Sequence, residues 1–186
     1  SSSNSSSNSG VNQSFVANMS ISRQTTQAIT VVGNGGSYAT LTLHTKRNGI
    51  WTETLSCSAR VGKNGITSSK REGDGKTPTG IYSFGQAFGV AGNPGTSRGW
   101  LQVNNNHYWV DDVNSPYYDK LVDASQTGIQ WSSAEHLIGY PTAYKYAIAV
   151  NYNTACTPGA GSAIFLHCST GGSTAGCISV SQVNMI

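Results

Sequence analysis

Charge is scarce in this sequence, and long apolar runs are absent. Charged residues make up 10% of its 186 residues, against about a quarter in an average soluble domain. A coiled coil would need abundant Glu, Lys and Leu in heptads, and a membrane-spanning helix would need about 18 consecutive apolar residues. The sequence has neither pattern, so both classes are excluded, and its length predicts one domain with a short tail.

Basic clusters and cysteines are few as well. The formal net charge of +3 comes from 11 basic and 8 acidic residues scattered along the chain, so we expect no nucleic-acid partner. Four cysteines are too few for a disulfide scaffold, and the absence of a CxxC pair argues against zinc or redox chemistry. We therefore expect no metal and no cofactor. One disulfide, between Cys57 and either Cys156 or Cys168, stays open for an exported protein.

The N-terminal segment contains only Ser, Asn and Gly over residues 1–10. Such a composition cannot bury enough apolar surface to fold. We therefore predict a flexible Ser/Asn-rich linker over residues 1–14 and a single folded domain over residues 15–186. A spacer of this kind suits a protein held away from a surface anchor, and a cloning junction would have the same composition.

Period-two alternation of apolar and polar residues, the mark of β-strands, is abundant. It predicts strands over residues 28–32, 39–43 and 51–55, and Asn48-Gly49 predicts a tight hairpin turn before the third. Apolar runs between Gly, Pro or Asn residues predict further strands at 80–84, 108–110, 144–152 and 162–167. The long run over 144–152 has an apolar centre, which predicts a place in the middle of a sheet.

Helical signals are few. Residues 132–137 can form a short capped helix, and Ser179 followed by Gln182 resembles a capping box, which predicts a helix that begins just after Cys177. Because this helix would run to Ile186, we expect the last element of the fold to be incomplete in this chain. The patterns together predict a mainly β fold, a compact sandwich or barrel-like sheet with two or three short helices.

The densest group of reactive side chains lies within residues 164–179. An apolar strand ends at His167, nine residues follow, and Gly176-Cys177 leads into the predicted helix. A thiol attacks as its thiolate, which a nearby imidazole and a helix N-terminus both favour. Cys177 is therefore a candidate nucleophile and His167 its candidate general base. The alternative is a buried, inert cysteine and a structural histidine.

Two blocks resemble the L,D-transpeptidase (YkuD-like) family. In that family a strand-end His precedes a variable loop and a Ser/Thr-His-Gly-Cys segment with the nucleophile, and residues 167–179 are similar to this signature. Residues 60–65 (RVGKNG) and 70–82 (KREGDGKTPTGIY) resemble a second family segment, Gly-Lys/Arg-Asn-Gly followed by Thr-Pro-x-Gly-x-Tyr. The resemblance extends from about Ala28 to the last residue, and it implies that residues 15–186 form a catalytic domain of this type.

The resemblance also implies roles. Cys177 corresponds to the nucleophile, His167 to the general base, and Cys168 to the residue whose backbone carbonyl orients the imidazole, with no cofactor required. Gly176 and Ala175 lie where backbone N–H groups would stabilise an oxyanion. The positions expected to contact substrate are Ser173, Thr174, Ser179 and, from a segment seen in wall-associated members, His136.

The chain departs from the family pattern at two positions. Ala175 stands where most members have His, and Ser179 where many have Arg or Asn. The missing Arg removes a cation that could hold a substrate carboxylate, and Lys63, Lys76 or Arg98 could supply another.

By this resemblance the protein acts in cell wall biogenesis, and hence in cell shape. The thiolate would attack a diamino-acid carbonyl in a peptidoglycan stem peptide, release D-alanine, and pass the acyl group to a second stem as a 3→3 cross-link. The implied partners are donor and acceptor stem peptides, with carbapenem-type β-lactams as covalent inhibitors. The implied location is extracellular, at the wall or surface of a bacterium. The alternatives are an L,D-carboxypeptidase, a cysteine hydrolase of another peptide, and a non-catalytic wall-binding module.

Overall fold

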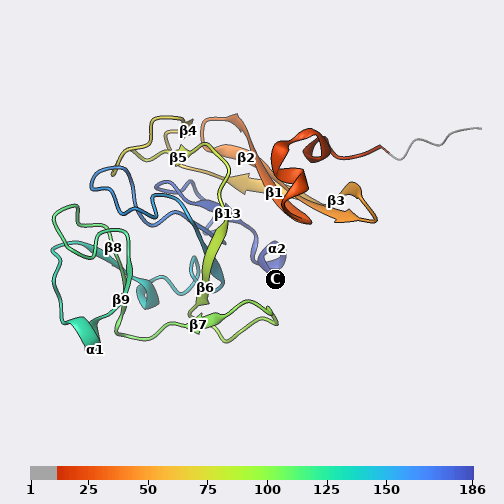
Figure 1. The fold of residues 1–186 in the computed structure, drawn as a ribbon. Helices are drawn as coiled ribbons and strands as arrows, with labels where there is room; N and C mark the ends of the chain where they lie inside the picture. The colour runs from red at the N-terminus through yellow and green to blue at the C-terminus, as the bar shows by residue number, and fades with distance from the viewer. Residues whose placement is uncertain (1–11) are drawn as a thin grey trace, which may run out of the picture. The chain divides into compact units, whose positions relative to one another are not determined.

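A computed structural model describes residues 12–186, so residues 1–11 of the predicted linker lie outside the described part. Within that part the chain is mainly β, with three sheets and a few short helices (Figure 1), as predicted. The described residues divide into two compact units, 12–30 with 41–56 and 31–40 with 57–186. No helix in the described range is long and apolar enough to cross a membrane.

The first unit contains two short 3-10 helices and parts of three strands. The helices are η1 (Phe15–Asn18) and η2 (Ser20–Arg23), and the strands are β1 (Gln27–Gly35), β2 (Tyr38–Arg47) and β3 (Ile50–Arg60). Asn48 and Gly49 have φ angles of 50° and 78°, the positive values that a primed hairpin turn requires. The predicted hairpin between β2 and β3 is therefore confirmed.

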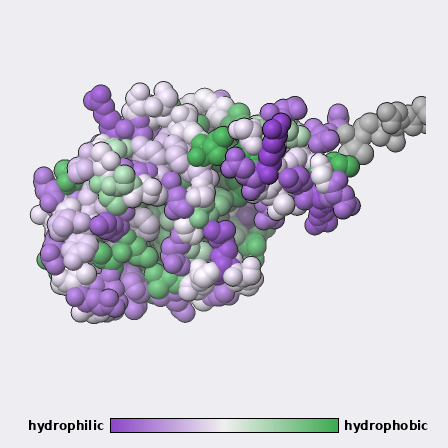
Figure 2. All heavy atoms as spheres, viewed as in Figure 1, coloured by the Kyte–Doolittle hydropathy of each residue, from purple (hydrophilic) through white to green (hydrophobic). Residues whose placement is uncertain are grey.

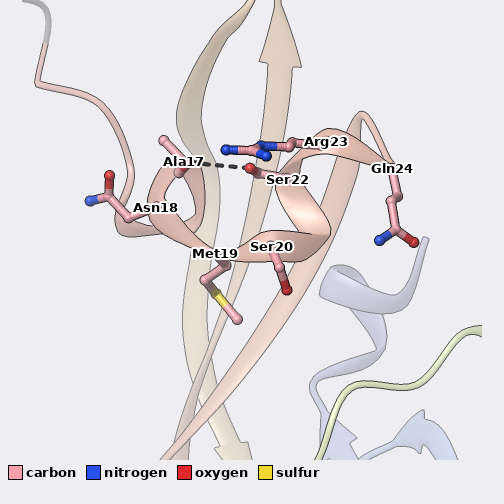
Figure 3. Close-up of a pocket in the computed structure, with 7 residues that line it drawn as sticks. All are labelled: Ala17, Asn18, Met19, Ser20, Ser22, Arg23 and Gln24. Carbon is pink, nitrogen blue, oxygen red and sulfur yellow. Dashed lines mark hydrogen bonds between the residues drawn. The ribbon is translucent and has the colours of Figure 1, made fainter.

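A small hollow lies beside η1 and η2 in this unit. Figure 3 shows its lining, and Ser22 Oγ donates a hydrogen bond to the Ala17 carbonyl at 3.1 Å. Arg23 is its one ionisable residue; the other lining residues are Asn18, Met19, Ser20 and Gln24. The hollow therefore lacks a nucleophile paired with a base.

The second unit holds the centre of the main sheet. Its strands lie in the order β13-β12-β11-β6-β7, with bounds β6 (Phe84–Gly89), β7 (Trp100–Gln102), β11 (Ala147–Val150), β12 (Phe165–Cys168) and β13 (Ile178–Val180). Strands β12 and β13 are parallel, whereas β11 is antiparallel to both of its neighbours, β12 and β6. The central position predicted for the long apolar run is thus confirmed for β11.

Two smaller sheets flank the site described below. One has the order β10-β8-β9, from β8 (His107–Val110), β9 (Leu121–Asp123) and β10 (Ala134–His136). The other pairs β4 (Ile66–Thr67) with β5 (Thr77–Pro78). The short helices of this unit are α1 (Ala124–Thr127), η3 (Leu137–Gly139) and α2 (Gln182–Met185).

Aromatic rings form the centre of the core in the second unit. Phe165 lies edge-on to Phe88, with ring centroids 5.1 Å apart, and Tyr144 packs edge-on against both rings. The face of the molecule in Figure 2 is hydrophilic or intermediate in hydropathy over most of its area, with small apolar areas between. This surface is typical of a chain in which Ser, Thr, Asn and Gly replace charged residues.

The helix predicted over residues 132–137 was wrong, and the C-terminal helix begins later than predicted. Residues 134–136 form β10, paired antiparallel with β8, and only a 3-10 turn follows. After Cys177 the chain enters β13, and α2 begins at Gln182 with Ser181 as its N-cap residue. In each segment a neighbouring strand forms the hydrogen bonds of the backbone N–H and carbonyl groups. In the second segment the β-branched residues Ile178 and Val180 also favour the extended conformation. Cys177 consequently has no helix N-terminus behind it.

Several strand boundaries also differ from those predicted. β6 begins at residue 84, where the strand predicted over 80–84 would end, and β11 covers only residues 147–150 of the predicted 144–152. The strand predicted over 162–167 begins at residue 165 and extends one residue further, to 168. Gly80 and Ala163 have φ angles of 132° and 54°. These values lie outside the strand region and break the ladder there.

Candidate active site

The parallel pair β12–β13 brings His167 and Cys177 onto one face of the sheet. His167 lies opposite Ser179, and the Phe165 N–H, two residues before His167, donates to the Cys177 Sγ at 3.4 Å. Side chains two residues apart on a strand share a face. The register of the parallel pair, extended by one residue, places Cys177 opposite Phe165, so the thiol and the imidazole share a face two residues apart along the sheet, although nine residues separate them in the sequence.

The hydrogen bond that His167 makes determines which ring nitrogen is available as a base. Its Nδ1 lies 2.8 Å from the Cys168 carbonyl oxygen. Since a carbonyl only accepts, Nδ1 carries the proton and Nε2 keeps its lone pair. Burial lowers the pKa of His167, and the bond to Cys168 opposes this only in part. The imidazole is therefore neutral near pH 7 and can take up a proton.

The Cys177 thiol is buried, with 7% of the residue exposed. Its Sγ donates to the Ala163 carbonyl at 3.2 Å and accepts from the Phe165 N–H. Burial and, to a smaller extent, the negative charge of Glu135 raise the pKa of Cys177, whereas the bond from Phe165 and the charge of Lys70 lower it; the net result is a pKa of about 12. The resting thiol is thus neutral, and its ionisation depends on the charges around it.

The loop before Cys177 is held by the segment with the second family block. Thr77 Oγ1 donates to the Gly176 carbonyl at 2.7 Å and accepts from the Gly62 N–H at 2.9 Å. Thr174 Oγ1 donates to the Cys177 carbonyl at 2.6 Å and accepts from the Gly176 N–H at 3.1 Å. The segment that contains Gly62 and Thr77 lies about a hundred residues before Cys177 in the sequence, and these hydrogen bonds hold it against the backbone on the N-terminal side of the nucleophile.

Gly176 contributes to this site through its missing side chain. Its φ angle is +154°, and a Cβ atom there would lie 3.0 Å from the Lys76 carbonyl oxygen, closer than such contacts normally allow. Its N–H is occupied by Thr174 in this structure. The oxyanion role expected for the Gly176 N–H would thus require that bond to open.

We expect Thr77→Val to destabilise the protein by about 1–3 kcal/mol, because it leaves the buried Gly62 N–H and Gly176 carbonyl without their partner. Urea unfolding of the variant against the parent measures this. Thr79→Val changes an exposed threonine two residues away and is expected to stay within about 0.5 kcal/mol. Equal effects of the two substitutions would contradict the assigned role of Thr77.

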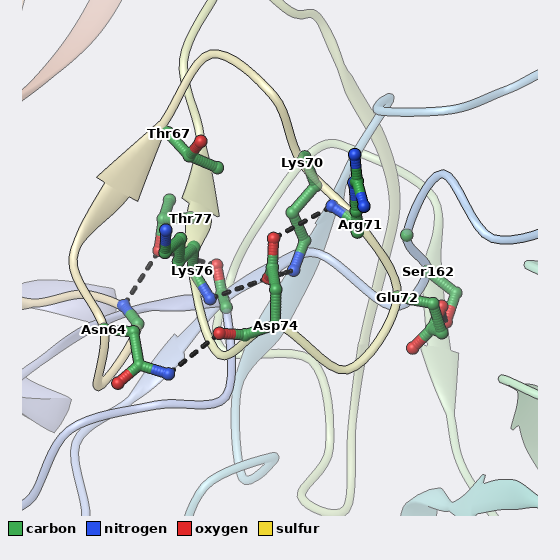
Figure 4. Close-up of polar contacts among 12 residues, drawn as sticks. Asn64, Thr67, Lys70, Arg71, Glu72, Asp74, Lys76, Thr77 and Ser162 are labelled. Atoms are coloured by element: carbon green, nitrogen blue, oxygen red, sulfur yellow. Dashed lines mark hydrogen bonds and ion pairs between the residues drawn. The ribbon is translucent and has the colours of Figure 1, made fainter.

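The loop over residues 70–76 is organised around Asp74 (Figure 4). Its carboxylate accepts from Lys70 Nζ at 2.5 Å and from the Arg71 and Lys76 N–H groups at 2.9 Å. Burial acts to raise the pKa of Asp74, but these hydrogen bonds outweigh it and lower the pKa. Asp74 is therefore ionised near neutral pH, and it fixes the position of the Lys70 ammonium group.

Sequence reasoning missed two further residues beside the thiol, Glu135 and Tyr144. The Tyr144 hydroxyl donates to the Glu135 carboxylate, and the Tyr144 ring lies edge-on to His167, 5.4 Å between centroids. Burial is the largest effect on the pKa of Glu135 and raises it, the bond from Tyr144 lowers it, and the charges of Asp111 and Glu72 raise it; the net result is a pKa of about 7. The sequence offered no clear signal for either residue, because Glu135 lies between Ala134 and His136 and its inward direction follows only from the register of the strand.

Glu135, rather than the predicted His136, faces Tyr144 and the Cys177 thiol. The His136 ring stacks on Tyr108 at 4.4 Å, and its Nε2 lies 2.8 Å from the Asn105 carbonyl oxygen. Neighbours along a strand point to opposite faces, so β10 turns one residue inward and the other outward.

The remaining predicted residues are divided between surface and interior. Ser173 and Ala175 are exposed, and Thr174 is half-buried. Ser179 is 1% exposed, and its Oγ has no hydrogen-bond partner among residues 12–186. Ser179 is thus too enclosed to meet substrate in this structure.

The cations and cysteines also differ from the options that the sequence left open. The Arg98 guanidinium donates to the Phe84 carbonyl, and Lys63 is exposed, whereas Lys70, which was not considered, is buried next to Gly176. All four cysteines are free thiols, so neither pairing of Cys57 is formed.

A buried thiol and a neutral imidazole on the same face of the sheet are the nucleophile and general base of cysteine catalysis, and a nearby ammonium group favours the thiolate. Residues 22–186 match the family model of the L,D-transpeptidase catalytic domain, YkuD, and the chain belongs to this family. A comparison with curated proteins finds no match. Family membership indicates an enzyme of the L,D-transpeptidase type with a peptidoglycan-related function.

Proposed function

We propose that the protein transfers acyl groups between peptidoglycan stem peptides through a thioester on Cys177, forming 3→3 cross-links. The observation that carries this proposal is the hydrogen bond from His167 Nδ1 to the Cys168 carbonyl. It holds the imidazole with Nε2 as the free base, on the same face as the thiol. The family match supports the choice of substrate.

The first half of the reaction forms the thioester. His167 Nε2 removes the thiol proton, and the Cys177 sulfur attacks the carbonyl carbon of the donor stem, so that a C–S bond forms and the carbonyl electrons move to oxygen. The oxyanion then collapses, the C–N bond to D-alanine breaks, and the leaving amine takes the proton from His167. The enzyme now holds the acyl group, and the base is neutral again.

In the second half an amine of another stem attacks the thioester. His167 accepts the proton of that amine, an amide bond forms, the C–S bond breaks, and the proton returns to the Cys177 sulfur. Such substrates occur in the bacterial cell wall. We therefore propose that the protein is secreted and acts at the wall, with effects on wall biogenesis and cell shape.

Intact-protein mass spectrometry after incubation with a carbapenem tests the proposal. We expect an adduct of the mass of the drug on the parent and none on Cys177→Ala, because the strained lactam acylates an activated thiol. A folded parent that forms no adduct would contradict it. Stem tetrapeptides then identify the acceptor: a cross-linked dimer supports transpeptidation, whereas release of D-alanine with a free tripeptide indicates the L,D-carboxypeptidase.

A further inference from the structure

A buried ammonium group lies against Gly176, the residue that precedes the nucleophile. The Lys70 side chain is only 5% exposed, and its Nζ lies 3.4 Å from the position that a Cβ atom on Gly176 would occupy. Gly176 directly precedes Cys177, and Thr77 ties the carbonyl groups of both residues to the same segment of chain. The ammonium group is thus placed at the reacting end of the site.

This ammonium group has hydrogen-bonding capacity to spare. It can donate three hydrogen bonds, and within residues 12–186 it forms one, to Asp74 at 2.5 Å. A buried cation with unused donors is unfavourable unless another acceptor or a negative charge takes them up. The unused N–H donors of Lys70 therefore indicate that a negative charge forms near it during the reaction.

Asp74 holds Lys70 in place but only partly neutralises the positive charge of its ammonium group. The carboxylate also accepts from two backbone N–H groups, those of Arg71 and Lys76, so its negative charge is shared among three donors. Asp74 thus fixes the ammonium group beside Gly176, the residue before the nucleophile.

We propose that Lys70 stabilises the negative charge at Cys177, first on the thiolate and then on the oxyanion of the tetrahedral intermediate. The thiolate part follows from the site alone, and the oxyanion part rests on the proposed function. In this role Lys70 opposes Glu135, the nearby anion that disfavours the thiolate.

Other charged and titratable groups around the thiol are accounted for. His167 is the base and is neutral before proton transfer, Tyr144 stays protonated because its pKa is raised well above the ordinary value, and Asp74 is paired with Lys70. Removal of Lys70 therefore leaves two negative charges on this side of the site, that of Glu135 and that of Asp74, which then has no cation beside it.

The test measures how fast iodoacetamide alkylates Cys177 as a function of pH. This reagent is uncharged, so Lys70 cannot attract it, and the thiolate displaces iodide as the C–S bond forms. Tandem mass spectrometry separates Cys177 from Cys57 and Cys156, the internal references. For Lys70→Met we expect the pH midpoint of alkylation at Cys177 to rise by about one unit or more, and the rate at pH 7.5 to fall about tenfold.

Two further variants and the shape of the pH profile make the result decisive. Arg71→Met removes the same charge from the exposed neighbouring residue and is expected to leave the midpoint unchanged, whereas Lys70→Arg is expected to restore at least part of the shift. A change in access alone would alter the rate at every pH without moving the midpoint. An unshifted midpoint in a folded Lys70→Met protein, or a parent whose Cys177 is never alkylated while Cys57 is, would overturn the role of Lys70.

The same variants separate this inference from the proposed function. If the parent forms a carbapenem adduct but Lys70→Met has an unshifted alkylation midpoint, acyl transfer stands and the role of Lys70 is overturned. If the midpoint shifts but no adduct forms, Lys70 tunes the thiol of a protein with another activity.

Discussion

Replacing His167 with Gln is expected to slow acylation of Cys177 by a carbapenem about 10²- to 10⁴-fold. Gln can fill much of the same space, but it cannot take up the thiol proton. The burial-raised pKa of Cys177, about 12, makes this loss severe because few thiols ionise without a base near pH 7. The measurement is the rate of adduct formation by intact mass, taken at several drug concentrations.

The pH dependence of the parent follows from the same residue. Burial lowers the pKa of His167 below its usual value of 6.5, so the neutral base form persists as the pH falls to that value and is lost only further down. The acid limb of the acylation rate is therefore expected to have its midpoint below pH 6.5.

A matched histidine variant controls for loss of a buried ring. His107 is buried in the same unit and accepts from the Asn104 N–H through Nδ1, and it lies in β8 rather than beside the thiol. His107→Gln is expected to retain the acylation rate if it folds. Similar losses in both variants, or a His167→Gln protein acylated at the parental rate, would exclude His167 as the base.

Glu135→Gln is expected to stabilise the folded protein at pH 8 by about 3 kcal/mol relative to the parent, with little difference at pH 4. Burial raises the pKa of the Glu135 carboxyl from 4.5 to about 7, so the folded state binds this proton more tightly than the unfolded state does. Stability of the parent therefore falls as the pH rises from about 4.5 through 7. Gln keeps an acceptor for the Tyr144 hydroxyl but has no proton to lose.

Urea unfolding of both proteins at pH 4, 6 and 8 checks this prediction. Other groups that titrate in this range, such as Asp119, are common to the two proteins and cancel in the difference. Glu53→Gln, which removes an exposed carboxylate, is the control for a change in net charge. A stability difference between Glu135→Gln and the parent that does not grow with pH would show that Glu135 is not a buried, proton-binding carboxyl.

The strands and their turns could be predicted from the sequence because their signals are local. The hairpin at Asn48-Gly49 depends on two residues that tolerate positive φ, and the β11 run on apolar residues with few polar interruptions. The helix predicted near Glu135 and the helix start predicted just after Cys177 failed for the opposite reason. A capping pattern describes what a segment can do alone, whereas pairing with β8 and β12 decided what it does.

The candidate site shows the same division. The sequence by itself was enough to recognise the family, which the family model confirms, and to predict His167 and Cys177 as base and nucleophile, because these residues and the Gly-rich and Thr-Pro blocks lie at recognisable spacings. It could not distinguish Glu135 from His136, which are adjacent in sequence, because only the register of β10 decides which faces inward. Nor could it single out Lys70 among the lysines of one loop. Burial, charge balance and hydrogen-bond partners arise when distant segments pack, and only the tertiary structure decided them.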